Sequence, residues 1–138
     1  MSVTDNTSAN STVTGDFDGT SNYSYDAIGN LISDTREQIA EIIWTVSGKV
    51  KEVIRTGNEI EPVGSGEYGS DMVFEYDAMG NRVSKLIKYR DATGLTGVTK
   101  TTFYIRDASG NVMATYTEDY DGSTTVQRLG DFNIYGSL

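Results

Sequence analysis

The sequence predicts an all-β protein, an antiparallel meander of repeated β-hairpins. A pentapeptide of the form Asp-Ala-x-Gly-Asn occurs three times, at residues 26–30, 77–81 and 107–111. A run of aromatic or β-branched residues precedes each copy, and a short β-prone run follows it, which is typical of strands joined by a short loop. Repetition of this kind usually defines the architecture, so hairpins are expected at these three places and at 47–49.

The chemistry of the pentapeptide fits a hairpin loop. Its Asp suits the first position, where a carboxylate accepts nearby backbone N–H groups. Its Gly suits the fourth, where a three-residue loop needs a positive φ, and its Asn then pairs with the Asp across the turn. Tyr25 should face Leu31, and Tyr76 should face Arg82 with a ring–guanidinium contact. The predicted turn residues are Asp26, Gly29, Asn30, Gly48, Asp77, Gly80, Asn81, Asp107, Gly110 and Asn111.

Residues 1–22 form a separate segment, dominated by Ser, Thr, Asn, Asp and Gly. This composition predicts a polar, flexible arm before a hairpin array at 23–138. The stretch from Asp16 to Asn22 carries spaced oxygen ligands, as a calcium loop does. A full calcium loop needs more ligands and a closing Glu, so an Asp-Gly turn is favoured.

The first half of the array contains one ambiguous stretch. After a hairpin at 23–33, Asp34 to Glu37 has the spacing of a helix capping box, which permits a short helix over 35–42. The β-branched and aromatic residues that follow favour a strand from Ile42 to Val46 instead. With Gly48 at the turn and 49–55 as the partner strand, this is a fourth, degenerate copy of the repeat in which Trp44 takes the aromatic place.

The second half begins with a loop insertion at 56–71, which holds four Gly and the only Pro. The elements expected after it are strands at 72–76 and 82–89, a loose turn at 91–97, strands at 98–106 and 111–118, a tight turn at 119–123 and a strand at 124–129.

Composition excludes several functions. The chain has no Cys and no His, which removes thiol chemistry, disulfides, the usual zinc sites and any histidine base. Its net charge of −9 argues against nucleic acid as a partner. No run approaches the roughly 18 apolar residues of a membrane span, and no secretory signal peptide is recognisable at the start.

The repeats resemble those of the YD-repeat (Rhs) family. The residues that carry the resemblance are 25–31, 43–50, 75–83 and 104–114, together with the ending Ile134-Tyr135-Gly136-Ser137. The third copy departs from the family pattern, with Arg106 where Tyr is expected. The match resembles the repeats just upstream of the family's C-terminal core. The family's self-cleaving segment would lie beyond Leu138, so no catalytic residue is carried over.

The resemblance implies a secreted or cell-surface protein of which this chain is one part. In the family, a strip of antiparallel hairpins spirals into a hollow shell, which encloses a toxic domain in some members and serves adhesion in others. The implied partner is the remainder of a longer chain, or a second copy joined through the sheet edges.

Three classes of function remain open. The favoured one is a non-catalytic structural and interaction module. The second is a carbohydrate-binding module, since Tyr25, Trp44, Tyr76 and Tyr104 could stack on sugar rings, although the strand positions of the aromatics favour packing within the sheet. The third is a glycosidase with two carboxylates, but no pair is marked in the sequence. No cofactor and no metal are predicted.

Overall fold

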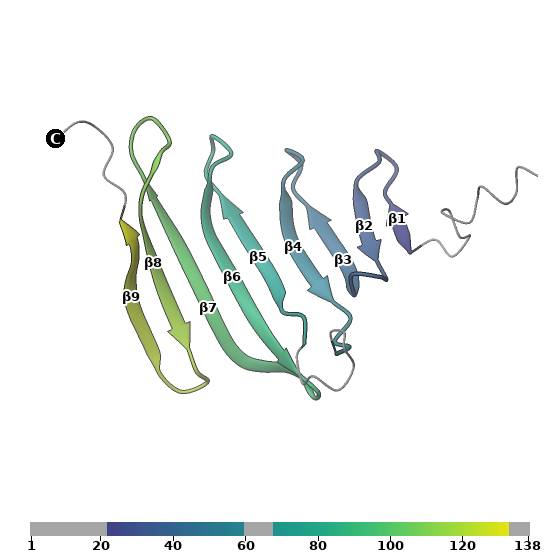
Figure 1. Cartoon of the computed structure of the whole chain (residues 1–138). Helices are drawn as coiled ribbons and strands as arrows, with labels where there is room; N and C mark the ends of the chain where they lie inside the picture. Colours follow the sequence, from purple (N-terminus) through teal and green to yellow (C-terminus); the bar gives the residue numbers. More distant parts are fainter. Residues whose placement is uncertain (1–21, 60–67, 133–138) are drawn as a thin grey trace, which may run out of the picture.

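The computed structural model describes residues 22–59 and 68–132, and these form a single antiparallel sheet. Nine strands follow one another in sequence order, each paired with its neighbours along the chain (Figure 1). In the described ranges there is no helix, and the sheet is open, with β1 and β9 at opposite edges. The predicted all-β meander of hairpins is therefore confirmed.

The strands lengthen toward the C-terminal edge of the sheet. Their bounds are β1 Tyr23–Tyr25, β2 Leu31–Asp34, β3 Ile39–Trp44, β4 Val50–Arg55, β5 Asp71–Tyr76, β6 Arg82–Asp91, β7 Gly94–Arg106, β8 Val112–Tyr120 and β9 Thr125–Phe132. The arm predicted at 1–22 lies outside the described residues except for Asn22, as do six of the seven candidate calcium-loop residues. Half of the insertion at 56–71, namely residues 60–67, and the ending at 134–137 also lie outside them.

Four hairpin loops, at 26–30, 45–49, 77–81 and 107–111, lie together at one end of the sheet (Figure 1). The turns that follow β2, β6 and β8 lie at the opposite end, as does the C-terminal end of β4. The predicted partners Tyr25 with Leu31 and Tyr76 with Arg82 are in register, and a β-bulge adjoins each pair. The sequence therefore fixes the register of each hairpin through its own loop.

The helix permitted at 35–42 is absent, and the strand expected at 42–46 is displaced. The Asp34 carboxylate does accept the Glu37 N–H at 3.1 Å, as a helix cap would. It closes a turn instead, because Gln38 adopts a left-handed φ of 56° and β3 begins at once at Ile39. Thr45 and Val46 belong to the next loop, because Thr45 takes the position that Asp holds in the other copies.

The connections after β6 are tighter than expected. Instead of a loose turn at 91–97, β6 continues to Asp91 and β7 starts at Gly94, and these two residues pair directly. The Asp91 carboxylate accepts both the N–H and the hydroxyl of Thr93, which closes the turn within two residues. In the next connection β8 reaches Tyr120, so the turn lies at 121–124, and β9 extends to Phe132.

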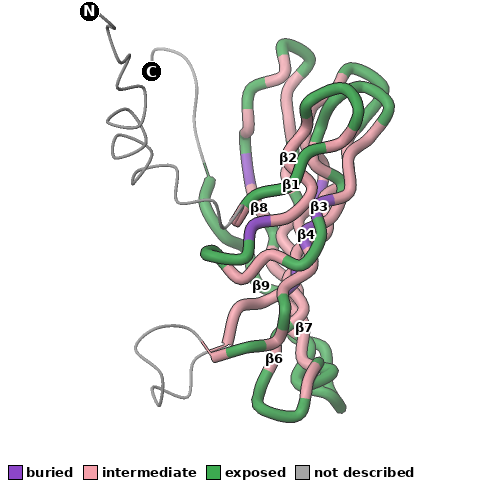
Figure 2. Tube along the Cα trace, turned by 90° about the vertical axis from the view of Figure 1, so that its right-hand side faces the viewer, coloured by how far each residue is buried: buried purple, intermediate pink, exposed green. Residues whose placement is uncertain are grey.

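The sheet has one layer and almost no core. Figure 2, turned by 90° from Figure 1, shows the strands edge-on with only short buried stretches. Among the described apolar residues only Ile42, Val53 and Ala114 are buried, and no large side chain is fully enclosed. Leu129 and Phe132, in contrast, are 59% and 62% exposed. Domains normally bury a sheet face against a second layer, and no such layer covers this sheet in the described part of the chain.

Candidate functional site

The hairpin loops share one hydrogen-bond pattern. In the loop at 77–81, Asp77 Oδ1 accepts the N–H groups of Met79 and Asn81, both at 2.9 Å. Its Oδ2 accepts the Asn81 side-chain amide at 3.2 Å, and Gly80 has a φ of 84°. The loops at 26–30 and 107–111 repeat every one of these contacts. The positive φ predicted for Gly110 and Gly29 is confirmed as well, at 87° and 91°.

The degenerate loop at 45–49 keeps the pattern with a hydroxyl in place of the carboxylate. Thr45 Oγ1 accepts the Lys49 N–H at 2.9 Å, and the Thr45 N–H donates to the Lys49 carbonyl oxygen at 2.7 Å. Gly48 has a φ of 77°. The loop geometry thus depends on an oxygen acceptor at the first position and a Gly at the fourth.

These contacts keep the loop carboxylates ionised. Hydrogen bonds from the backbone and then the side chain of Asn30 lower the pKa of Asp26, and Asn111 lowers that of Asp107 in the same way. The backbone N–H of Asn81 is the main cause of the lowered pKa of Asp77. A catalytic acid needs a raised pKa, so these aspartates are suited to turn formation and unsuited to that role.

Neighbouring hairpins are joined by a repeated hydrogen bond, which we call the inter-hairpin bond. Its donor is the side chain of the last strand residue before a loop, and its acceptor is the first carbonyl after the preceding loop. Tyr76 Oη donates to the Val50 carbonyl at 2.8 Å. The other two cases run from Trp44 Nε1 to the Leu31 carbonyl at 2.8 Å and from Arg106 Nη2 to the Arg82 carbonyl at 3.1 Å.

The aromatic residues considered for sugar stacking are therefore mostly engaged within the sheet. Trp44 and Tyr76 are half-buried donors of inter-hairpin bonds. Tyr104 is half-buried, with the Arg106 guanidinium 6.0 Å from its ring centre. Tyr25, at 60% exposure, is the most accessible of the four. The structure does not gather them into one platform, although Tyr76 and Tyr104 line the same depression.

That depression lies on the sheet surface beside the loops. It has a volume of about 390 Å³, and three cations, Lys49, Arg82 and Arg106, line it with the two tyrosines. The Arg82 guanidinium lies 4.4 Å from the Phe74 ring centre, so the ring contact predicted for Arg82 forms with Phe74 and not with Tyr76. The lining side chains include no carboxylate, although Asp77 is near enough for Arg106 to lower its pKa further.

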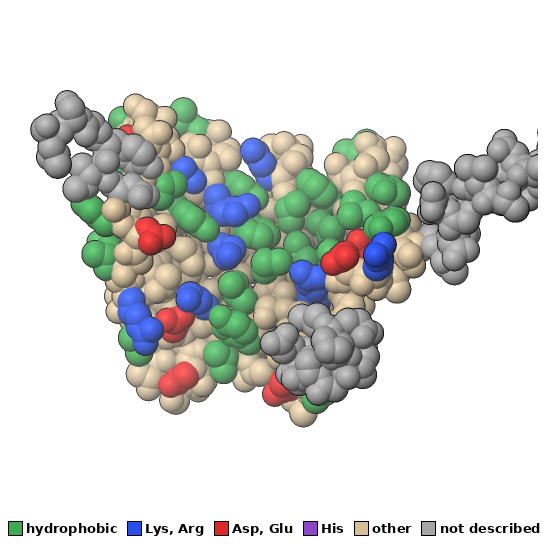
Figure 3. Space-filling view, in the orientation of Figure 1, with side chains coloured by type: hydrophobic (Ala, Val, Ile, Leu, Met, Phe, Trp, Pro, Cys, Tyr) green, Lys and Arg blue, Asp and Glu red, His purple; other side chains and the backbone are tan. Residues whose placement is uncertain are grey.

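The two faces of the sheet differ in their charges, although Asp119 lies with the basic residues of one face, and Lys88 and Arg90 lie with the carboxylates of the other. Residues in register lie on the same face, so Lys85 shares a face with Phe74 and Arg128. Lys100 lies on that face too, and we call it the basic face. Figure 3 shows Lys and Arg side chains gathered over β5 to β8. On the opposite, acidic face, the carboxylates are Glu41, Glu52, Asp71, Glu75 and Glu118.

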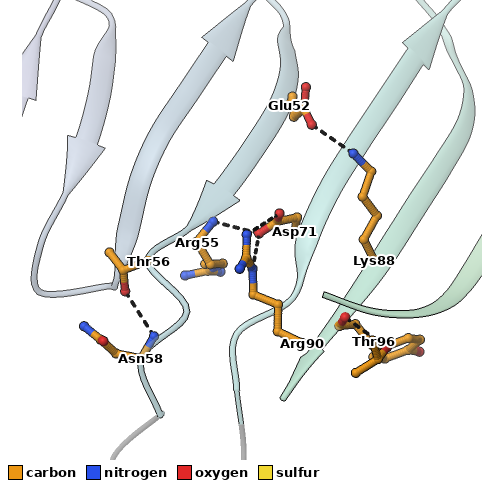
Figure 4. A network of polar contacts seen from close by, with 9 residues as sticks. Glu52, Arg55, Thr56, Asn58, Asp71, Lys88, Arg90 and Thr96 are labelled. Atoms are coloured by element: carbon orange, nitrogen blue, oxygen red, sulfur yellow. Dashed lines mark hydrogen bonds and ion pairs between the residues drawn. The ribbon is translucent and has the colours of Figure 1, made fainter. Parts of the chain in front are cut away.

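On the acidic face, Asp71 closes the seam where β4 and β5 diverge. Figure 4 shows its carboxylate between two arginines: Oδ1 accepts the Arg55 backbone N–H and Arg90 Nε, and Oδ2 accepts Arg90 Nη2, all at 2.8 Å. Burial alone would raise the pKa of Asp71, but the bonds from Arg90 and Arg55 outweigh it, and the pKa is lowered. Lys88 and Glu52 form a more exposed ion pair nearby at 3.1 Å.

Three carboxylates of the acidic face are engaged with neighbouring side chains. Glu75 accepts a hydrogen bond from the Ser84 hydroxyl, and Asp71 and Glu52 are paired with cations. No group of three or more carboxylates in the described ranges is placed to hold a metal ion. The same ranges contain no helix long and apolar enough to cross a membrane.

Two structural residues escaped sequence reasoning. Arg106 occupies a position at which an aromatic residue was expected. Only its hydrogen bond to the Arg82 carbonyl shows that it donates an inter-hairpin bond, as Tyr76 does. Asp71 was assigned to a loop, and its partner Arg90 lies 19 residues away. The shared face of Lys85 and Lys100 becomes visible only once the strand register is known.

Comparison with known proteins identifies no relative, since no protein-family model, curated protein sequence or solved structure matches the chain. Any functional conclusion therefore rests on the geometry of the sheet.

Proposed function

We propose that this chain is a non-catalytic structural and interaction module, one segment of a larger β-sheet shell of the YD-repeat kind in a secreted or cell-surface protein. The observation that supports this best is the inter-hairpin bond, repeated three times along an open sheet of one layer. Repeat arrays grow by adding similar interfaces between neighbouring units. The resemblance to the YD-repeat family implies a shell that encloses a toxic domain in some members.

The acidic face provides the surface for a covering layer. Across β7 to β9 it presents Phe103, Ile105, Tyr116 and Leu129, which are 41–59% exposed. A groove of about 230 Å³ between Phe103 and Tyr116 continues this apolar strip. Contiguous exposed apolar surface of this type marks an interface. In the proposed shell, the remainder of the chain or its enclosed content covers this strip.

The proposal is tested by removing apolar side chains from this strip. The double variant Phe103→Ser/Leu129→Ser should bind much less of a hydrophobic dye and associate less than the unchanged chain. The matched control is Ile28→Ser/Met79→Ser, because these residues are 85% and 86% exposed but lie in the hairpin loops. Equal loss of dye binding in both double variants would show that the strip is not a special surface and would contradict the proposal.

A carbohydrate-binding module remains the second candidate, supported by the depression at Tyr76 and Tyr104. Two half-buried rings beside three cations suit a sugar that carries an acidic group. A glycan array should then show binding to acidic sugars that Arg82→Ala weakens, with Lys88→Ala on the other face as the control. An array without any binding to acidic sugars would remove this candidate.

A further inference from the structure

We propose that Tyr25 is a docking donor at the β1 edge. The partner that it takes is the second strand of another hairpin of the same kind, running antiparallel to β1. This inference rests on the proposed function and names the partner and the contact at one edge of the shell segment.

The three inter-hairpin bonds define what this position does. In each, the donor is the last strand residue before a hairpin loop, namely Trp44, Tyr76 or Arg106. An indole, a phenol and a guanidinium differ in size and charge, yet each reaches an equivalent carbonyl. The position relative to the loop therefore selects the acceptor, and any side chain with a donor at the right reach can fill it.

The acceptor is also defined by its place. It is the carbonyl of the first strand residue after the preceding loop, namely Leu31, Val50 or Arg82. A β-bulge adjoins each of these residues, with two residues facing one across the pair. A bulge disrupts the ladder locally and re-aims the backbone. The hairpin loop thus creates both the register and the acceptor.

Tyr25 occupies the donor position of the first hairpin. It is the last residue of β1 before the loop at 26–30, and the loop has the shared geometry. Its side chain is 60% exposed, and its hydroxyl has no hydrogen bond to any described residue. In the described sheet β1 pairs with β2 alone, so its other edge is open to a further strand.

Strand direction decides which kind of partner fits. The acceptor strand must leave a loop at the same end of the sheet as 26–30 and run antiparallel to β1. Strand β9 starts at the opposite end, after the turn at 121–124, and runs in the same direction as β1. A second copy added edge to edge in the same orientation would therefore present β9 parallel to β1, without the carbonyl that Tyr25 needs. A hairpin with an Asp-x-x-Gly-Asn loop meets both requirements.

The test uses the full chain and a synthetic hairpin peptide with the sequence of residues 71–91. Amide hydrogen exchange should slow at residues 23–25 when the peptide is added. Tyr25→Phe should weaken peptide binding about fivefold, the usual effect of one lost hydrogen bond. Tyr25→Arg should retain binding, because Arg106 fills the equivalent position. The matched control is Tyr23→Phe, which removes a hydroxyl from the same strand and should change nothing.

Two results would overturn the inference. If Tyr25→Phe and Tyr23→Phe both bind the peptide as the unchanged chain does, the Tyr25 hydroxyl is not the docking donor. The shell proposal would survive this result as long as the chain still associates. If residues 23–25 are already protected in the chain alone, and this protection disappears when residues 1–21 are deleted, the edge belongs to the chain's own N-terminal segment. A chain that neither associates nor binds the peptide would contradict the shell proposal itself.

Discussion

The two ends of the sheet are built on different principles. At the loop end, four loops share one set of hydrogen bonds, and the same inter-hairpin bond joins each to the next. At the opposite end, no single pattern is shared by all the connections. One places Gln38 at a positive φ, one spans the residues between Arg55 and Asp71, and two are tight turns closed by Asp91 and Asp121.

The difference separates local from long-range stabilisation. A loop carboxylate reaches no further than four residues along the chain, as Asp77 does to Asn81. Asp71 instead joins backbone and side chains that lie 16 and 19 residues away. Loss of a local contact weakens one hairpin, whereas loss of a long-range contact separates two. Substitution of Asp71 should therefore cost more than substitution of a loop aspartate such as Asp77.

The largest expected effect follows from Asp71→Ala. The side chains of Asp71 and Arg90 are only 5% and 15% exposed, and removing one partner leaves a largely buried charge unpaired. We expect the free energy of unfolding to fall by about 3 kcal/mol in chemical denaturation. Glu52→Ala breaks a more exposed pair with Lys88 on the same face, so it should cost less than about 1 kcal/mol. Similar losses of unfolding free energy in the two variants would contradict the role of Asp71 in joining β4 and β5.

A smaller effect is expected at the loop end for Gly80→Val. A β-branched residue fits a φ of 84° poorly, so the free energy of unfolding should fall by about 1 kcal/mol or more. Ala78→Val, in the same loop but without a positive φ, is the control and should have little effect. An unchanged melting temperature for Gly80→Val would refute the loop assignment.

The inter-hairpin bond predicts a difference between two tyrosines at equivalent positions. Tyr76→Phe removes the bond to the Val50 carbonyl and should lower the free energy of unfolding by about 1 kcal/mol. Tyr25→Phe removes a hydroxyl with no described partner and should leave the stability of the isolated chain unchanged. Equal losses, measured by thermal unfolding, would show that the bond does not stabilise the sheet.

The smallest effect concerns acid stability of the loops. Asp26, Asp77 and Asp107 have lowered pKa values in the folded chain, so their contribution is present above the unfolded-state pKa of about 4. It is lost as the pH falls through the lower folded values. Replacing all three by Asn should flatten the decline in melting temperature below pH 4. If the melting temperature of the variant declines below pH 4 with the same slope as that of the unchanged chain, other carboxylates cause the acid sensitivity.

Sequence reasoning works well where structure is local. The three loops, their glycine conformations and the pairs Tyr25–Leu31 and Tyr76–Arg82 follow from the pentapeptide, because turn chemistry acts within five residues. The turn at 35–38 could not be predicted this way, because the contact between the Asp34 carboxylate and the Glu37 N–H is compatible with a helix cap and with a turn. The charged faces depend on strand register, and the Asp71–Arg90 pair depends on which strands are neighbours, so neither is visible in a short window.

We expect this one-layer sheet to be a segment that a partner covers. Sedimentation velocity at low and high salt tests it most directly, because the charge of −9 opposes association and salt screens it. Open edges and the exposed apolar strip of β7 to β9 should then drive association, and the associated fraction should rise with salt. A stable, monodisperse monomer at both salt concentrations would show that the sheet needs no covering partner.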